Sequence, residues 1–536
     1  MKFAVLSDIH YVSPEVIVND PDSAISSSVS VQALKDASSY DDIDTILITG
    51  DLTDKGDKKS HLGLLEILKE IKASGKKIYV TTATHDFNHH RAYTRRRGDT
   101  KAVFDKKPWE LPYFDKDNAD FREFLSEESK ILPDEEIIPG LEACFSPDEL
   151  WELYSDFGRN SAFSVEDSSY SYCVDLDEKT RCLMLNDNFR NEEALHDISV
   201  TYSPKCLRWI AEMVKKAKED GKFIFACTHH PLIPPSPAYR IGAGLRDMRS
   251  PYSVHVLADI GINLALTGHS HFSDVGFAES EKGNILCDIT TPSVRFYPPK
   301  YRIVNLDGLN SRISYKCITV SKPEDVEIGD MSLEEYYRNN LYNEYLNKVL
   351  SLNKPFNKII SEIKVKDIYF LFRHSAKLSE AEYATIKETK LFDLLTSAAF
   401  NMLSGDGKYT PDTPEYKLLM SIASALDSII DSQPFFDLKK KVLKGYSVKE
   451  VVEPLCFNNY TCDNEGILDF SVKPCRKMET PVLNSVAGDV VMIFLCVVAV
   501  LLSGVSPYLI TFGLPAATIV KKIRNKKNDQ KPNYIY

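Results

Sequence analysis

The sequence has no two cysteines at the C-x-x-C spacing, although its 536 residues include 11 cysteines. It therefore offers no all-thiolate zinc site of the common kind. The first residues, MKFAVLSDIH, lack the pattern of a secretory signal, so we expect reduced, buried thiols rather than a disulfide framework. Cys456, Cys462 and Cys475 lie near one another, and a disulfide or metal knuckle there stays an alternative, although no histidine accompanies them.

The sequence also lacks an excess of basic residues. Its 65 Lys and Arg against 77 Asp and Glu give a net charge of −12, which disfavours a dedicated nucleic-acid binder but leaves room for a local basic surface. With 43% hydrophobic and 26% charged residues, wholesale disorder is excluded, and the length predicts two or three folded units. Only His374 of the 12 histidines lies beyond residue 271, so histidine-based metal chemistry belongs to the first half.

One long stretch has no charge at all, from Val490 to Val520. A transmembrane helix needs about 20 apolar residues, so we predict a membrane segment over residues 488–520. The tail at 521–536 contains six Lys or Arg and one Asp, which is typical of a cytoplasmic or anionic-lipid-facing segment. We expect a membrane protein whose catalytic domain lies in the cytoplasm.

Two membrane arrangements stay open. A single span would place the basic tail on the side opposite a cytoplasmic domain, against the positive-inside trend. A bent or re-entrant segment, broken at its glycines and prolines, would keep both ends in the cytosol. These residues are Gly504, Pro507, Gly513 and Pro515.

The first part of the chain alternates strand-like and helix-like segments. The runs KFAVLSD, DTILITG and KKIYVTTATHD are apolar and β-branched, and SHLGLLEILKEIKASG is helical. This alternation predicts a layered α/β domain, here assigned to residues 1–322, with an insertion at about 88–169. SYSYCVDL and RCLMLND predict a β-hairpin. Residues 323–480 predict a mainly α-helical region, with an unknown protein partner or a structural role.

Five polar motifs fall where predicted strands end, which is where α/β sheets present ligand-binding residues. Mixed carboxylate and imidazole ligands suit Mn, Fe or Zn ions, and a carboxylate that bridges two cations lets them share a hydroxide and hold a phosphoryl group. Glycines before Asp51 and His269 allow tight turns. The motifs are Asp8-Ile9-His10, Gly50-Asp51-Leu52-Thr53-Asp54, Thr84-His85-Asp86, His229-His230-Pro231 and Gly268-His269-Ser270-His271.

In this order the motifs resemble those of the calcineurin-like metallophosphoesterase superfamily, D-x-H, G-D-x-x-D, G-N-H-[DE], H-x-P and G-H-x-H. The resemblance covers about residues 1–320. Within the superfamily, this sequence resembles the branch that includes cyclic-nucleotide and glycerophosphodiester phosphodiesterases. It implies a four-layer α/β/β/α sandwich, followed here by the α-helical region and the transmembrane segment. It also implies two divalent metal ions and hydrolysis of a phosphodiester or phosphomonoester by a metal-bridging hydroxide.

The resemblance implies a role for each matching residue. Asp51 corresponds to the bridging ligand, Asp54 supports its loop or caps a turn, and His230 is a neighbour rather than a ligand. His85 corresponds to the catalytic histidine, oriented by Asp86 through a hydrogen bond. The implied ligands are Asp8, His10 and His271 for the first metal, and His229, His269 and the residue at Thr84 for the second.

Thr84 departs from the family pattern, which has asparagine there as a ligand of the second metal. A threonine hydroxyl is a poorer ligand, and two outcomes stay open. The second site is filled but weaker, with Thr84, water or Asp86 completing it. Alternatively, His85 moves inward as a ligand, which removes the catalytic acid.

Basic residues that follow the third motif are candidates for substrate binding, because arginine forms bidentate contacts with phosphate. The alternative is ordinary solvated charge. The candidates are His89, His90, Arg91 and Arg95, continued by Arg96 and Arg97, with a second set at Arg240, Arg246 and Arg249.

The sequence thus favours a membrane-anchored, metal-dependent phosphoesterase that acts on a phosphate ester. Three alternatives remain: a nuclease, an enzyme acting on a lipid phosphate, and a non-catalytic membrane effector or scaffold that binds a phosphate or nucleotide. In the last case, the helical region would pass a signal to the membrane segment.

Overall fold

The computed structural model describes part of the chain: residues 1–16, 21–86, 144–187, 202, 204–233, 251–280, 282–350, 361–405, 409–430, 447–456 and 463–472. No helix within these residues is long and apolar enough to cross a membrane. The predicted membrane segment at 488–520, the tail at 521–536, both basic sets, Cys462 and Cys475 lie outside them.

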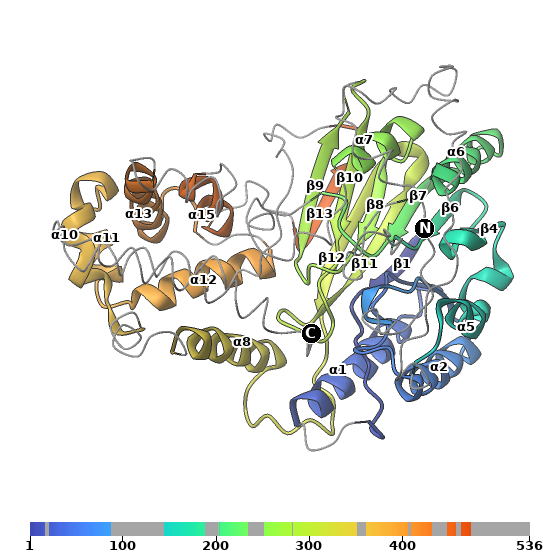
Figure 1. Cartoon of the computed structure of the whole chain (residues 1–536), viewed down its shortest axis with the longest axis horizontal. Helices are drawn as coiled ribbons and strands as arrows, with labels where there is room; N and C mark the ends of the chain where they lie inside the picture. Colours follow the sequence, from blue (N-terminus) through green and yellow to red (C-terminus); the bar gives the residue numbers. More distant parts are fainter. Residues whose placement is uncertain are drawn as a thin grey trace, which may run out of the picture.

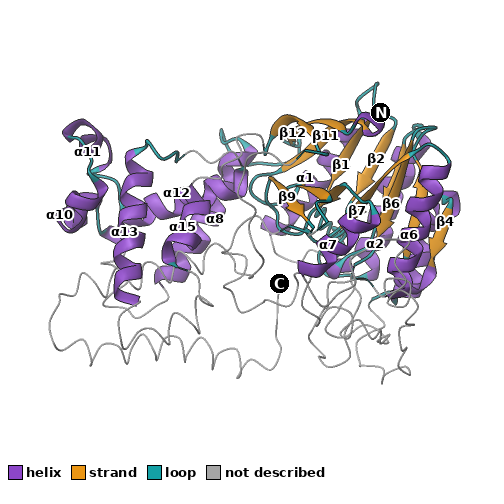
Figure 2. Cartoon of the chain, turned by 90° about the horizontal axis from the view of Figure 1, so that it is seen from above, coloured by secondary structure: helices purple, strands orange, loops and turns teal. Residues whose placement is uncertain are grey.

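Two β-sheets form the centre of the first part of the chain (Figures 1 and 2). The six-stranded sheet has the order β13-β12-β11-β1-β2-β3, with β1, β2 and β3 parallel and β11 antiparallel to β1. Its strands are β1 (Lys2–Leu6), β2 (Thr45–Ile48), β3 (Lys77–Val80), β11 (Lys300–Asp307), β12 (Arg312–Thr319) and β13 (Glu465–Asp469).

The seven-stranded sheet has the order β4-β5-β6-β7-β8-β10-β9, and β6, β7, β8 and β10 run parallel. The antiparallel pairing of β5 with β6 confirms the predicted hairpin. The strands are β4 (Ser164–Glu166), β5 (Ser171–Asp175), β6 (Thr180–Leu185), β7 (Phe223–Thr228), β8 (Leu264–Thr267), β9 (Asp274–Glu279) and β10 (Ile285–Thr290).

The alternation of side chains along β1 shows how the layers form. Phe3 and Val5 point into the core between the sheets, whereas Ala4 and Leu6 point to the opposite face, against helices. Both faces of the strand are buried, as its continuous apolar run requires. The helices beside the six-stranded sheet are α1 (Pro21–Ser38) and α2 (Lys58–Ala73), and those beside the seven-stranded sheet are α6 (Pro204–Glu219) and α7 (Pro251–Ile260).

These helices and sheets confirm the expected mixed α/β sandwich. The helix α2 begins where the Asp57 side chain accepts a hydrogen bond from the Ser60 N–H, and it buries Leu64, Leu68 and Ile71 on one face. Shorter helices connect the layers: η1 (Thr84–Asp86), α5 (Pro147–Leu153), η4 (Ser155–Phe157), η5 (Arg159–Ser161), η6 (Asp167–Ser169) and η8 (Gly308–Asn310).

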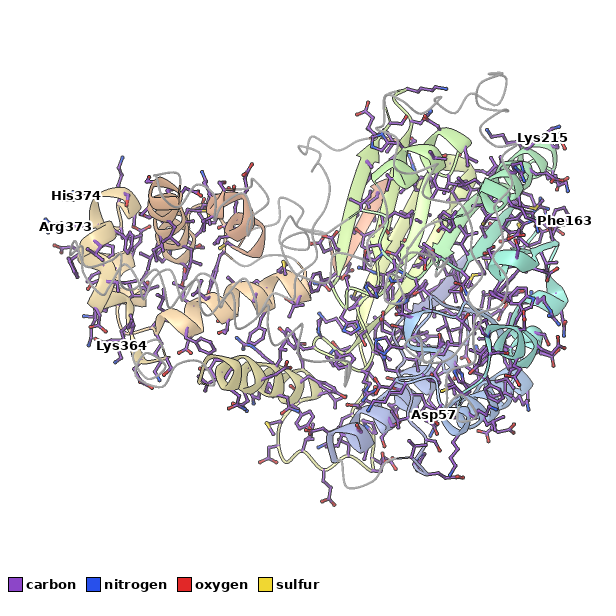
Figure 3. The ribbon with its side chains drawn as sticks, viewed as in Figure 1. Asp57, Phe163, Lys215, Lys364, Arg373 and His374 are labelled. Atoms are coloured by element: carbon purple, nitrogen blue, oxygen red, sulfur yellow. The ribbon has the colours of Figure 1, made fainter. Side chains whose placement is uncertain are left out.

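Further helices lie beside the sandwich, and Figures 1 and 2 show them from two directions. His374 and Arg373 lie at their outer end (Figure 3). The eight cysteines of the described residues are free thiols. The helices are α8 (Leu333–Leu350), α10 (Val365–Ala376), α11 (Glu380–Ile386), α12 (Leu391–Ser404), α13 (Pro414–Ile430) and α15 (Val448–Cys456).

The strand β13 was not expected, because residues 323–480 had been interpreted as mainly helical. It pairs antiparallel with β12 and forms the edge of the six-stranded sheet. Two residues before the strand, Asp463 is fully buried, and its carboxylate accepts a hydrogen bond from the Val275 N–H at 3.2 Å. The Ser273 N–H donates to the carbonyl of Leu403 at the end of α12. The helical region is therefore attached to the loop after β8.

Arg302 on β11 holds this junction together. Its buried guanidinium donates to the carbonyls of Asp463 (2.8 Å) and Thr290 (2.7 Å) and to the Ser273 hydroxyl (2.9 Å). Removing a charged donor leaves these buried acceptors without a partner, which is costly in a water-free interior.

We expect Arg302→Met to lower the free energy of unfolding by about 3 kcal/mol or more, because three hydrogen bonds from a charged group are lost. Urea unfolding followed by tryptophan fluorescence measures this. The matched control is Arg312→Met on the neighbouring strand, which is exposed and should change stability by less than about 0.5 kcal/mol. Equal effects of the two substitutions would contradict this role of Arg302.

Candidate metal centre

The five sequence motifs meet at one place, at the carboxyl ends of strands from both sheets. Asp8 and His10 follow β1, Asp51 follows β2, and Thr84, His85 and Asp86 form η1 after β3. His229 and His230 follow β7, and His269 and His271 follow β8. Because parallel strands end at the same edge, residues far apart in the chain lie side by side, such as Asp8 and His269, which are 261 positions apart.

The backbone at this edge adopts an uncommon conformation. Eight non-glycine residues within the described ranges have positive φ, and five of them are predicted metal ligands. Such residues cost of order 1–3 kcal/mol each and persist only where the surrounding structure holds them. Here the N–H groups of Asp8 and His10 donate to carbonyls of the neighbouring loop. The five are Asp8, His10, Asp51, His269 and His271, with φ between 46° and 61°.

Two glycines allow the loops to approach one another, as the sequence predicted. Gly50 has a φ of 110°, and a Cβ atom there would lie 2.8 Å from Nδ1 of His229. A Cβ atom at Gly268 would lie 1.7 Å from the Ser7 hydroxyl and 2.8 Å from the Asp8 carboxylate. A side chain at either position would therefore displace the predicted ligands.

The first set of predicted ligands is grouped around Asp8, which is fully buried. Its Oδ2 accepts hydrogen bonds from the Ser7 hydroxyl and the His269 N–H. Its Oδ1 lies 3.2 Å from Nε2 of His271 and 3.6 Å from Nε2 of His10. In the described part of the chain, Asp8 Oδ1 and both ring nitrogens of His10 have no hydrogen-bond partner. These buried, orphaned donors and acceptors fit a divalent cation.

The carboxylate of Asp51 lies between two sets of imidazoles. Its Oδ1 accepts hydrogen bonds from the His85 N–H at 2.8 Å and the Thr84 hydroxyl at 3.3 Å. Its Oδ2 lies 3.1 Å from Nε2 of His229 and 3.8 Å from Nε2 of His10. One oxygen is thus held by the protein while the other faces both sets, which is the arrangement expected of a bridging ligand.

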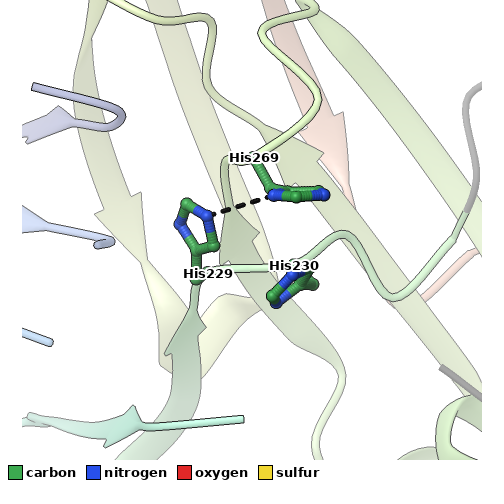
Figure 4. A group of neighbouring side chains, drawn as sticks. All are labelled: His229, His230 and His269. Carbon is green, nitrogen blue, oxygen red and sulfur yellow. Dashed lines mark hydrogen bonds between the residues drawn. The ribbon is translucent and has the colours of Figure 1, made fainter. Parts of the chain in front are cut away.

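The second set contains three histidines (Figure 4). Nδ1 of His229 contacts the Thr49 carbonyl at 3.0 Å, and its Nε2 lies 3.2 Å from Nδ1 of His269. Because a carbonyl only accepts, Nδ1 of His229 carries the proton and Nε2 is the nitrogen that faces the centre. Burial and the nearby His230 and His229 lower the pKa of His269 well below its ordinary value, so its imidazole is neutral, as a ligand must be.

Among the histidine, cysteine, aspartate and glutamate side chains of the described residues, four groups of three have ligand atoms within 4.8 Å of one another. The Thr84 hydroxyl donates a hydrogen bond to the Asp51 carboxylate. The groups are Asp8, His10 and His271; Asp8, Asp51 and His229; His10, Asp51 and His85; and His229, His230 and His269.

The orientation predicted for His85 differs from the structure. The carboxylate of Asp86 accepts hydrogen bonds from the N–H groups of Thr53 and Ala83, at 2.9 and 2.7 Å. Nδ1 of His85 instead contacts the backbone carbonyl of Asp54 at 2.7 Å. Asp86 therefore connects the loops after β2 and β3, and burial, with the nearby charge of Asp51, raises its pKa to about 7. A main-chain carbonyl performs the orienting role expected of the Asp86 side chain.

Arg295 and Phe296 lie at this centre without any sequence motif to indicate them. Nη1 of Arg295 contacts the Asp54 carboxylate at 3.1 Å and the His10 carbonyl at 2.7 Å. Burial opposes the ionised form of Asp54, but His10 and Arg295 lower its pKa to about 2. The ring of Phe296 stacks on His271 at 4.7 Å. The Asp54 carboxylate thus connects the loop after β2 to Arg295 and His10.

The candidate substrate-binding residues His89, His90, Arg91 and Arg95, and the second arginine set, lie outside the described residues. Their roles stay predictions.

Metal binding at this centre should depend on pH, because two of the predicted ligands, His10 and His229, have raised pKa values. Burial alone would lower the pKa of His10 and His229, but the carboxylates of Asp54, Asp8 and Asp51 raise the pKa of His10 to about 9. Mainly through Asp51, the pKa of His229 rises to about 10. In the metal-free protein, the two protonated histidines stabilise the fold through their pairing with these carboxylates. This stabilisation is complete below pH 6.5 and is lost as the pH rises through 9 to 10. A cation must displace both protons.

We therefore expect about one proton to be released per divalent cation bound at pH 7, and binding to tighten between pH 6.5 and 9. Titration calorimetry in buffers with different heats of ionisation measures the released protons. His374→Asn, at an exposed position, should release as many protons as the unaltered protein. Binding without proton release would show that His10 and His229 are neutral before the metal arrives.

Comparisons with known proteins gave a family match and matches to solved structures. Residues 1–273, half of the chain, match the model of the calcineurin-like phosphoesterase family. Among solved structures, a dimetal phosphatase from Danio rerio is 14% identical with a TM-score of 0.35, and the match covers 60% of this chain and 98% of that one. A purple acid phosphatase from yellow lupin (Lupinus luteus) seeds is 12% identical with a TM-score of 0.30, covering 61% and 52%.

A comparison with curated proteins gave no match. The family match spans all five motifs, and the structure brings their histidines and aspartates together in groups that fit divalent cations. The chain therefore belongs to the calcineurin-like phosphoesterase family and is a metal-dependent phosphoester hydrolase.

Proposed function

We propose that this chain hydrolyses a phosphodiester or a phosphomonoester at a two-cation centre around Asp51. The observation that carries the proposal is the position of Asp51 Oδ2, which faces His10 on one side and His229 on the other. Two divalent cations at these donors would activate water and neutralise the charge of a phosphoryl group. The mixed carboxylate and imidazole set suits Mn, Fe or Zn ions.

His85 is suited to move a proton at this centre. Its Nδ1 is fixed by the Asp54 carbonyl, so Nε2 is the nitrogen that exchanges a proton with a substrate. Its ring meets that of His10 edge to face at 4.6 Å, which places it beside the first set of ligands. We propose that His85 serves the leaving oxygen of the ester, with its ring held by the loop after β2 rather than by Asp86.

Basic side chains are candidates for binding the phosphate group of the substrate. We propose that His89, His90, Arg91 and Arg95 bind the phosphate ester, because they follow His85 directly in the chain and arginine is well shaped for phosphate oxygens. A nuclease activity stays the second enzymatic interpretation, supported only by this basic segment.

Activity should depend on Asp51 and tolerate a better ligand at Thr84. We expect the full chain to hydrolyse bis-p-nitrophenyl phosphate or p-nitrophenyl phosphate when Mn²⁺ is added. Asp51→Asn should lower kcat/KM by at least about 100-fold, because it weakens the bridge on which several kcal/mol of charge stabilisation depend. Thr84→Asn should keep turnover and reach half-maximal activity at a lower Mn²⁺ concentration.

The matched control is Asp41→Asn, an exposed carboxylate near the end of α1, which should leave kcat/KM unchanged. No hydrolysis of either ester by the unaltered protein, and none by Thr84→Asn, would contradict turnover of simple esters. It would favour a membrane effector that binds a phosphate or nucleotide without hydrolysing it.

We propose further that residues 488–520 hold the enzyme at a membrane, with the catalytic domain in the cytoplasm. The uncharged run from Val490 to Val520 is long enough to enter a bilayer, and the basic tail would contact anionic lipid. Thiols without disulfides in the described residues are compatible with a reducing compartment. A lipid phosphate would then be a substrate within reach.

The full chain should remain in carbonate-washed membranes, and deletion of residues 488–536 should release it, whereas deletion of 521–536 alone should not. A cysteine introduced by Asn533→Cys then tests the topology in intact cells. Labelling from outside supports a single span, and protection supports a re-entrant segment. A full chain found in the soluble fraction would contradict the anchor.

A further inference from the structure

We propose that His230 binds the second cation directly, and so supplies the donor that the family pattern places at position 84. This inference rests on the proposed two-cation function. It assigns a ligand role to a residue that the family pattern treats as a neighbour of the ligand His229. The carrying observation is a buried ring nitrogen of His230 with no hydrogen-bond partner in the described residues.

The position of His230 places it within reach of the second set. The side chain is fully buried, and its ring packs against that of His269 with 4.0 Å between centroids. The ring of His229 lies 4.9 Å away and nearly perpendicular to it (Figure 4). One nitrogen from each of the three rings lies within 4.8 Å of the other two, close enough for one cation to contact all three.

Asp187 determines which nitrogen of His230 is available. Its Oδ1 lies 2.9 Å from Nδ1 of His230, so Nδ1 donates its proton to the carboxylate and Nε2 holds the lone pair. Its Oδ2 accepts hydrogen bonds from the His230 N–H and from the Thr228 hydroxyl. A carboxylate that orients an imidazole in this way is typical of histidines that bind metal through their other nitrogen.

An unpartnered Nε2 in this position needs an explanation. Leaving a buried polar atom without a partner costs about 1–3 kcal/mol, and a basic nitrogen among other ligand atoms gains most from a cation. Two of the rings beside it, those of His229 and His269, are themselves ligand candidates. A cation bound to Nε2 of His230 removes this cost.

Thr84 leaves room for such a replacement. Its hydroxyl donates to Oδ1 of Asp51 at 3.3 Å, so it helps to hold the bridging carboxylate. With Asp51, His229 and His269, His230 completes a set of one carboxylate and three imidazoles. This nitrogen-rich set favours Zn²⁺ or Fe²⁺ over Mg²⁺, which prefers oxygen ligands.

The competing role for His230 is structural, in which its bond with Asp187 only fastens the loop after β7. His230→Asn separates the two roles, because an asparagine amide nitrogen reaches the position of Nδ1 and keeps the contact with Asp187. It removes the nitrogen at Nε2. A structural His230 would therefore tolerate this change, and a ligand would not.

The experiment is a Zn²⁺ titration of the metal-free full chain, with bound metal counted by mass spectrometry. The unaltered protein should bind two ions. His230→Asn should still bind one ion tightly but should lose affinity for the second ion. The loss should exceed 10- to 100-fold, which is the usual cost of removing a residue that only hydrogen-bonds to a ligand. Adding Thr84→Asn to His230→Asn should recover most of this affinity, and His374→Asn, at an exposed position, should change nothing.

Asp187→Asn gives an independent measurement, because it leaves the ring of His230 in place and removes the charge that orients it. The second ion should bind about 10- to 100-fold more weakly. Substitution of Co²⁺ for Zn²⁺ should also give a different visible absorption spectrum in His230→Asn, because one nitrogen ligand is lost. This readout does not depend on turnover.

Two results would overturn the inference. One is unchanged affinity for the second ion in both His230→Asn and Asp187→Asn. The other is an unchanged Co²⁺ spectrum in a folded His230→Asn protein. Failure of the unaltered protein to bind two ions would be a different result, because it contradicts the proposed two-cation function itself.

Discussion

The centre depends on one carboxylate that the protein holds by a single oxygen. Oδ1 of Asp51 is fixed by the His85 N–H and the Thr84 hydroxyl, which leaves Oδ2 facing imidazoles on both sides. This asymmetry requires the loop after β2 to approach the loops after β3 and β7. Gly50 permits that approach, because any side chain there would meet Ala83 and His229.

The buried charges explain why so many histidines surround this carboxylate. Asp8 and Asp51 are nearly inaccessible to water, and ionised carboxylates are costly to bury without compensation. Burial works against ionisation, yet the surrounding histidines lower the pKa of both aspartates well below the ordinary value. In the metal-free protein the imidazoles carry the compensating charge, and cations take it over when they bind. The same groups thus compensate one another's charge and provide donor atoms that fit divalent cations.

That the polar motifs meet at one edge could be predicted from the sequence, because short polar motifs after apolar strands indicate where a sheet ends. The sandwich followed from the same alternation of strands and helices. The contacts between loops could not be predicted. Asp187 contacts His230 across 43 positions, and Arg295 contacts the His10 carbonyl across 285. No periodic pattern marks such pairs.

Two further differences between the sequence-based predictions and the structure also arise from contacts between distant segments or with the backbone. Asp86 follows His85 directly, which suggested that it orients the histidine, but its carboxylate is taken by two backbone N–H groups of the turn. The strand β13 has only five residues and lies after a long helical stretch, so its pairing with β12 depends on Arg302 and Asp463 rather than on a strong strand pattern.

The most direct test of this account is a crystal structure of the zinc-loaded protein with anomalous diffraction at the zinc edge. The account predicts two peaks that share Asp51, one beside Asp8, His10 and His271. The second should lie about 2.0–2.1 Å from Nε2 of His230, with the Thr84 hydroxyl still directed at Asp51. A single zinc peak would contradict the two-cation centre. A second zinc ion that contacts the Thr84 hydroxyl and lies away from His230 would contradict the ligand role of His230.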